Sequence, residues 1–123
     1  MKKIIILEGL DNVGKTTIKE LLNKKTNYNY CIIDRFLGSC FAYSLLKDRD
    51  NPWEFLDLEK TLDNKIFYLV YLYSNQRDIL SRQKLKKDND ININMIDELS
   101  IFYNYYLNNT HLKALILNTS KFS

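Results

Sequence analysis

Glycine and proline are scarce in this chain, which has three glycines and one proline among 123 residues. Their scarcity excludes collagen-like and linker-rich proteins, and it argues against β folds whose many tight turns need both residues. Hydrophobic residues make up 46% of the sequence, enough for a chain of this length to bury one core, so intrinsic disorder is excluded. We therefore expect one folded domain over residues 1–123.

Long apolar runs, a strong charge excess and cysteine motifs are also missing. The run Ile4–Leu7 is far too short to cross a bilayer, and the first residues show no signal-peptide cleavage pattern, so we expect a soluble, cytoplasmic protein with no membrane partner. A net charge of +3 argues against a nucleic-acid partner. Cys31 and Cys40 have neither CxxC spacing nor a histidine nearby, and we expect them to be buried free thiols.

Apolar residues alternate between strand-like runs and helical spacing along the chain. Strands are expected at 3–8, 30–36, 66–73 and 113–118. Helices are expected at 15–25, 38–47, from Asn51-Pro52 onward, at 76–86, and from a capping-box-like start at Asn94 through 107. Buried strands that alternate with helices predict a three-layer α/β/α domain with a parallel sheet of about four strands.

The loop between the first strand and the first helix carries a phosphate-binding motif. It fits GxxxxGK[ST] with Gly9, Leu10, Asp11, Asn12, Val13, Gly14, Lys15 and Thr16. Glycine at both ends lets successive backbone N–H groups point at a β-phosphate, and the following helix presents its positive end. Lys15 would reach the β- and γ-phosphate oxygens, and Thr16 would bind Mg²⁺.

This loop predicts binding of ATP with Mg²⁺ and a P-loop kinase core. One alternative is an incidental glycine-rich turn, which is disfavoured because the motif seldom arises by chance and lies between a strand and a helix. The other is a degenerate loop that no longer binds nucleotide, which is disfavoured because Lys15 and Thr16 are intact.

Two segments resemble the thymidylate kinase family. Residues 8–17 are similar to that family's EGxDxxGKTT loop, which extends the expected ATP contacts to Thr17. Residues 34–43 match its DR(Y/F)xxSxxAY segment at the same spacing. The resemblance implies that Arg35 contacts the acceptor phosphate, that Asp34 lies near Mg²⁺, and that Asp11 meets a sugar hydroxyl. It also implies transfer of the γ-phosphate of ATP to a nucleoside monophosphate, with dTMP as the first expectation.

Several of these side chains also have roles that follow from their chemistry. An aspartate that ends a strand beside a phosphate loop is a candidate metal ligand, and a planar guanidinium suits phosphate, although Asp34 and Arg35 could instead form an ion pair. Glu8 could bind Mg²⁺ through water. The aromatic residues Phe36, Tyr43 and Trp53 could stack on a base, with core packing as the alternative for each, whereas the tyrosines within 68–73 and 103–106 are expected to pack.

A basic segment at 77–87 resembles the lid that closes over ATP in the family. The phosphate loop has no arginine, so we expect a lid arginine to supply that charge, with Arg82 first and Arg77 second; a solvated basic helix face is the alternative.

The sequence also departs from the family. Between Thr17 and Asp34 only one helix and a short turn fit, whereas the family inserts acceptor-binding elements there, and Ser44 replaces a base-reading glutamine. Two other functions therefore stay open. One is a deoxynucleoside kinase that uses Asp34 or Glu8 as a base for a hydroxyl acceptor, and the other is an ATP-binding module without turnover. P-loop kinases often dimerise, so a homodimer is a further open expectation.

Overall fold

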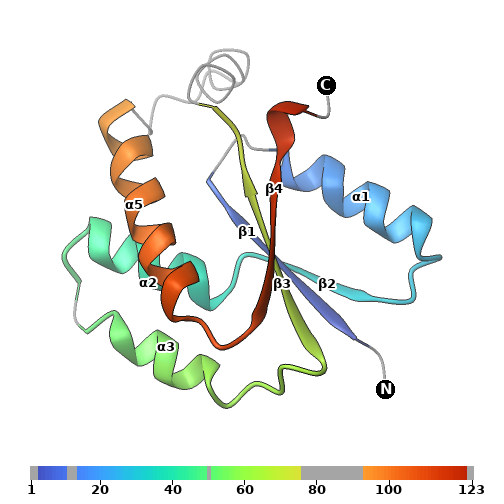
Figure 1. The fold of residues 1–123 in the computed structure, drawn as a ribbon, viewed down its shortest axis with the longest axis horizontal. Helices are drawn as coiled ribbons and strands as arrows, with labels where there is room; N and C mark the ends of the chain where they lie inside the picture. Colours follow the sequence, from blue (N-terminus) through green and yellow to red (C-terminus); the bar gives the residue numbers. More distant parts are fainter. Residues whose placement is uncertain (1–2, 11–13, 50, 76–92, 122–123) are drawn as a thin grey trace.

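A four-stranded parallel sheet forms the centre of the molecule, with its strands in the order β2-β1-β3-β4 (Figure 1). The structure, a computed structural model, describes residues 3–10, 14–49, 51–75 and 93–121. Its strands are β1 (Ile4–Gly9), β2 (Cys31–Asp34), β3 (Phe67–Tyr73) and β4 (Lys113–Asn118). Its helices are α1 (Lys15–Lys25), α2 (Leu37–Leu46), α3 (Trp53–Glu59) and α5 (Ile93–Asn109), with a 3-10 turn η1 (Thr119–Lys121) after β4.

Helices cover both faces of the sheet, because parallel strands need crossover connections that return over a face. Figure 1 shows α1 on one side, and α2, α3 and α5 together on the other. This arrangement confirms the predicted three-layer α/β/α architecture and the parallel sheet.

The core lies between the two central strands and the helices α2 and α5. Strands β1 and β3 are continuous apolar runs, and their central residues are buried, as expected for strands covered on both faces. Each helix turns one apolar stripe toward the sheet, since apolar residues three or four apart share a face. The buried helix residues include Phe41, Ala42, Leu56, Ile96, Leu99, Tyr103 and Tyr106. The edge strand β4 differs, with Leu115 and Ile116 more than half exposed.

Some element boundaries differ from the expected ones. Strand β2 ends at Asp34 because Arg35 adopts a positive φ of 65°, which breaks the extended backbone. Helix α5 is described from Ile93, so Asn94 lies inside the helix and not before its first residue. The helix expected at 76–86 lies outside the described residues. Within the part of the chain that is described, no helix combines the length and apolar character needed to span a membrane.

The prediction that both cysteines are buried is wrong. Cys31 and Cys40 are free thiols, and both are exposed. Cys31 begins the edge strand β2, and Cys40 lies on the side of α2 turned away from the core, so the apolar segments around them do not cover their side chains.

The tyrosine-rich segments are only partly buried. Tyr71, Tyr103 and Tyr106 are buried, whereas Tyr73 and Tyr105 are 40% and 53% exposed. Packing is therefore confirmed for three of these tyrosines. Tyr68 is half-buried. Tyr73 is the last residue of β3, beyond its covered centre, and Tyr105 lies on the side of α5 that faces solvent.

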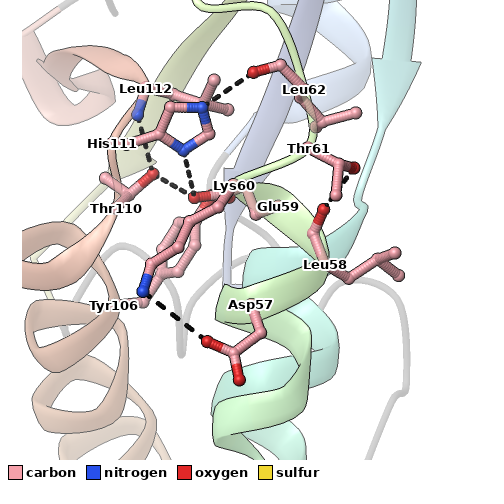
Figure 2. A network of polar contacts seen from close by, with 10 residues as sticks. All are labelled: Asp57, Leu58, Glu59, Lys60, Thr61, Leu62, Tyr106, Thr110, His111 and Leu112. Atoms are coloured by element: carbon pink, nitrogen blue, oxygen red, sulfur yellow. Dashed lines mark hydrogen bonds and ion pairs between the residues drawn. The ribbon is translucent and has the colours of Figure 1, made fainter.

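A buried carboxylate joins α3 to the end of α5 and the start of β4, as Figure 2 shows. Glu59 is 1% exposed and accepts hydrogen bonds from the hydroxyls of Tyr106 and Thr110. The ring of His111 lies between Glu59 and the carbonyl of Leu62, with Nδ1 at 4.0 Å from the carboxylate and Nε2 at 2.8 Å from that carbonyl. Hydrogen bonding satisfies the buried carboxylate and fixes α3 against α5.

Candidate functional site

The candidate site lies where β1 and β2 end, at the carboxyl edge of the sheet. Leu7 of β1 pairs with Asp34 of β2, and the N–H of Arg35 donates to the Leu7 carbonyl over 2.8 Å. Because the strands are parallel, both chain segments leave the sheet at the same edge. The fold therefore brings the end of β1, where the phosphate loop begins at Gly9, to the same edge as the Asp34–Arg35 turn.

The described ends of the phosphate loop have the conformation that its glycines allow. Gly14 has a φ of 88° and precedes the first turn of α1. That left-handed value favours glycine, because a Cβ there would strain the backbone. Thr16 and Thr17 follow on the first turn of α1, and both are exposed. The remaining predicted nucleotide contacts of the loop, residues 11–13, lie outside the described residues.

Lys15 turns its ammonium group back over the loop that precedes it. The side chain is buried, and Nζ donates to the carbonyls of Gly9 at 3.2 Å and Leu10 at 2.8 Å. These two bonds hold a positive charge at the end of β1, and the dipole of α1, which begins at Lys15, also favours an anion at its first turn. The arrangement suits a polyphosphate.

Glu8 is fully buried and lies under the first turn of α2. Its Oε2 accepts hydrogen bonds from the N–H groups of Phe36 at 3.1 Å and Ser39 at 2.9 Å, and its Oε1 accepts one from the Ser39 hydroxyl. No cap comes from the helix's own N-cap residue, so a carboxylate from β1 takes that place.

Burial raises the pKa of Glu8, while its hydrogen bonds to Ser39 and Phe36 and the charge of Lys15 act in the opposite direction. With both oxygens engaged by α2, the side chain has a structural role, and its predicted contact to Mg²⁺ stays a prediction.

Arg35 and Tyr43 form a polar corner beside the loop. Arg35 has the left-handed φ described above, a strained conformation of the kind that clusters at functional sites. Its guanidinium carbon lies 5.7 Å from the centre of the Tyr43 ring, within the range of a cation–π contact. The Tyr43 hydroxyl is buried and has no hydrogen-bond partner within the described ranges. A buried polar atom without a partner needs an explanation, and a bound molecule would supply one.

The predicted Mg²⁺ ligands Asp34 and Thr16 lie at the surface. Each offers an oxygen of the kind that Mg²⁺ binds together with phosphate oxygens and water. No cluster of three or more acidic, histidine or cysteine side chains able to hold a metal occurs in the described part of the chain.

The structure describes the aromatic residues that were candidates for base stacking, but it does not describe the lid. Phe36 is half-buried against the core, whereas Trp53 is 48% exposed and meets Phe41 edge-on at 5.1 Å between ring centres. The lid residues Arg77 and Arg82 lie outside the described residues.

Two residues at the site escaped the sequence analysis as functional candidates. Ser39 is part of the matched motif but had no role assigned, and Tyr103 was expected only to pack. The Tyr103 ring is fully buried, yet its hydroxyl lies 2.9 Å from the Ser39 Oγ and 3.4 Å from the Gly9 carbonyl. The sequence feature that could have indicated a role for Tyr103 is its place on the apolar face of a helix, because the hydroxyl of a buried tyrosine usually has a hydrogen-bond partner inside the protein.

The chain is similar in part of its sequence to a nucleotide kinase and in its fold to a protein solved with a bound nucleotide. No known family description matches the sequence. Over 69 residues the chain is 30% identical to a cytidylate kinase from Chlamydia caviae, a match that covers 56% of this chain and 30% of that kinase. Its structure is similar to that of the YorR protein from Bacillus subtilis, solved in complex with phosphorylated GDP. The TM-score is 0.79 and the identity 24%, and the match covers 97% of this chain and 87% of that chain. The chain thus spans under a third of the cytidylate kinase's length, and it shares the α/β fold of YorR.

Proposed function

We propose that this protein transfers the γ-phosphate of ATP to the phosphate of a nucleoside monophosphate. The observation that carries the proposal is that two cationic residues follow the carboxyl ends of two neighbouring strands. Lys15 follows the end of β1, Arg35 follows the end of β2, and these strands are neighbours. One cation would hold the donor phosphates and the other the acceptor phosphate.

The reaction needs positioning and charge neutralisation more than acid–base chemistry. The acceptor phosphate is already ionised at neutral pH, so no general base is required. The first N–H groups of α1 and Lys15 would bind the polyphosphate, Thr16 and Asp34 would hold Mg²⁺, and Arg35 would orient the acceptor. Bound Mg²⁺ would neutralise charge that develops on the transferred phosphoryl group. Arg82 is our proposal for the lid cation.

We further propose dTMP as the preferred acceptor. The support is the similarity of residues 34–43 to the thymidylate kinase segment, together with the Tyr43 hydroxyl beside Arg35, which is buried and has no hydrogen-bond partner among the described residues. In this assignment Phe36 and Tyr43 face the base or sugar and Asp11 meets a sugar hydroxyl. The similarity to a cytidylate kinase makes CMP the first competing acceptor to test.

The test is phosphate transfer from ATP to a panel of dTMP, CMP, GMP and thymidine, with Mg²⁺ present. Transfer to dTMP above the other acceptors supports the proposal. Transfer to thymidine alone would instead identify a nucleoside kinase, and saturable ATP binding without acceptor-dependent ADP release would identify a module without turnover.

Two substitutions test the separate roles proposed for Lys15 and Arg35. Lys15→Ala should lower the transfer rate at least about 100-fold and weaken ATP binding, because the donor phosphates lose their lysine. Arg35→Ala should raise the KM for the monophosphate about tenfold while the Kd for ATP stays unchanged. Lys24→Ala and Arg49→Ala are matched controls, since both side chains are exposed and lie away from the loop. Unchanged acceptor kinetics in the Arg35 variant would remove that residue from the site.

A further inference from the structure

A chain of buried hydroxyls connects α5 to the acceptor side of the candidate site. Ser39 gives its hydroxyl proton to Glu8, so its Oγ can accept the proton of the Tyr103 hydroxyl at 2.9 Å. Glu8 in turn receives the N–H groups of Phe36 and Ser39. The chain of contacts therefore runs from Tyr103 through Ser39 and Glu8 to the residue that directly follows Arg35.

From this geometry we infer that Tyr103 is a positioning residue for Arg35, an inference that rests on the proposed function. Arg35 sits at a strained φ of 65°, between the end of β2 and the first turn of α2. Strained conformations persist only where the surroundings hold them in place. The Glu8 carboxylate holds the N–H of Phe36, and Tyr103 fixes the serine that bonds to that carboxylate.

The distances decide which half of the site depends on Tyr103. Its hydroxyl is 2.9 Å from Ser39 and 3.4 Å from the Gly9 carbonyl, so the single phenol proton goes mainly to Ser39. The Gly9 carbonyl already receives the ammonium group of Lys15 at 3.2 Å. Loss of the Tyr103 hydroxyl should therefore affect the acceptor side more than the ATP side.

Tyr106 provides a matched control on the same helix. It is also almost completely buried, and its hydroxyl also bonds to a buried carboxylate, but that carboxylate is Glu59, outside the candidate site. Tyr103→Phe and Tyr106→Phe each remove one buried hydroxyl and leave the ring in place. Both should lose stability, and only the first should change the site.

The experiment combines amide exchange with kinetics. In Tyr103→Phe the N–H groups of Phe36 and Ser39 should exchange with deuterium at least about tenfold faster, and the KM for dTMP should rise about tenfold, with the Kd for ATP unchanged. Tyr106→Phe should leave all three quantities unchanged. Ser39→Ala should raise the KM for dTMP to a similar extent, and adding Tyr103→Phe to it should have little further effect, because both act through one chain of bonds.

Each other result would overturn part of the assignment. Unchanged exchange at Phe36 and Ser39 would show that Tyr103 does not hold the turn. Faster exchange with an unchanged KM in an active enzyme would show that acceptor binding does not depend on how firmly this turn is held. If the unsubstituted protein transfers no phosphate and binds no monophosphate, the proposed function fails, and faster exchange would then leave Tyr103 with a structural role alone.

Discussion

Glu8 is a candidate metal ligand in the sequence, but in the fold its carboxylate binds the start of helix α2. As a carboxylate at the end of a buried strand beside a phosphate loop, it is a reasonable metal candidate. In the structure its two oxygens bond to Ser39 and to the N–H of Phe36. Its charge is therefore stabilised by a helix start, and burial opposes that charge.

The raised pKa of Glu8 predicts the direction in which stability changes with pH. The native protein binds this proton more tightly than the unfolded chain does, so its contribution to the free energy of unfolding is present at low pH. That contribution is lost as the pH rises from the usual value of 4.5 through the raised native pKa.

Glu8→Gln removes the titrating carboxyl group, so comparison with the original protein isolates its contribution to stability. In urea unfolding without divalent cations, the free energy of unfolding of the original protein minus that of the variant should fall with pH above about 4.5. A difference that stays constant or rises between pH 4.5 and 8 would contradict the shift.

At the scale of elements, the contact between α2 and α5 sets the geometry of the site. Gly38 lies in the first turn of α2, where a Cβ would come within 2.6 Å of the Tyr106 ring and 2.7 Å of Glu8 Oε2. A larger residue there would push α2 away from both. The helix could then no longer place its first N–H groups on the Glu8 carboxylate.

Gly38→Ala should therefore destabilise the protein by about 1–3 kcal/mol. In an exposed helix position the same change would stabilise it by up to about 1 kcal/mol, so the sign of the effect reports the close contact. Cys40→Ala, at an exposed position of the same helix, is the control and should change the free energy of unfolding little. A Gly38 variant as stable as the original protein in urea unfolding would show that α2 is not held this closely.

At the scale of the molecule, the network around Glu59 and the candidate site use different polar groups, although the Tyr106 ring lies between them, against Gly38. Thr110 and His111 precede β4, so the network around Glu59 lies toward the amino ends of the strands. The phosphate loop and Arg35 follow the carboxyl ends of β1 and β2. Because the Glu59 bonds do not include Lys15 or the first turn of α1, substitution of Glu59 should affect stability more than ATP binding.

Glu59→Ala should destabilise the protein by about 3 kcal/mol, because the hydroxyls of Tyr106 and Thr110 lose a buried acceptor. Below its unfolding transition the variant should bind ATP with an unchanged Kd. Glu54→Ala, on the exposed side of the same helix, should alter neither quantity. Calorimetry and urea unfolding measure both. An ATP affinity that falls with the Glu59 substitution would show that the network around Glu59 influences ATP binding.

The sequence alone predicted the α/β class, the four strands, most element boundaries and the position of the phosphate loop. These features depend on local information, because apolar periodicity and glycine spacing involve residues close together along the chain. The resemblance to the thymidylate kinase family implied that Asp34 and Arg35 end a strand beside that loop, and the pairing of β2 with β1 agrees with it.

Only the tertiary structure decided which polar groups meet and which side chains are covered. The bonds that define the role of Glu8 and Tyr103 join residues 28, 31, 64 and 94 positions apart, a separation at which no local pattern carries information. Likewise, the exposure of Cys31 and Cys40 depends on which strand lies at the edge of the sheet and which side of a helix meets the core. A buried polar group must find a partner, but packing alone selects which one.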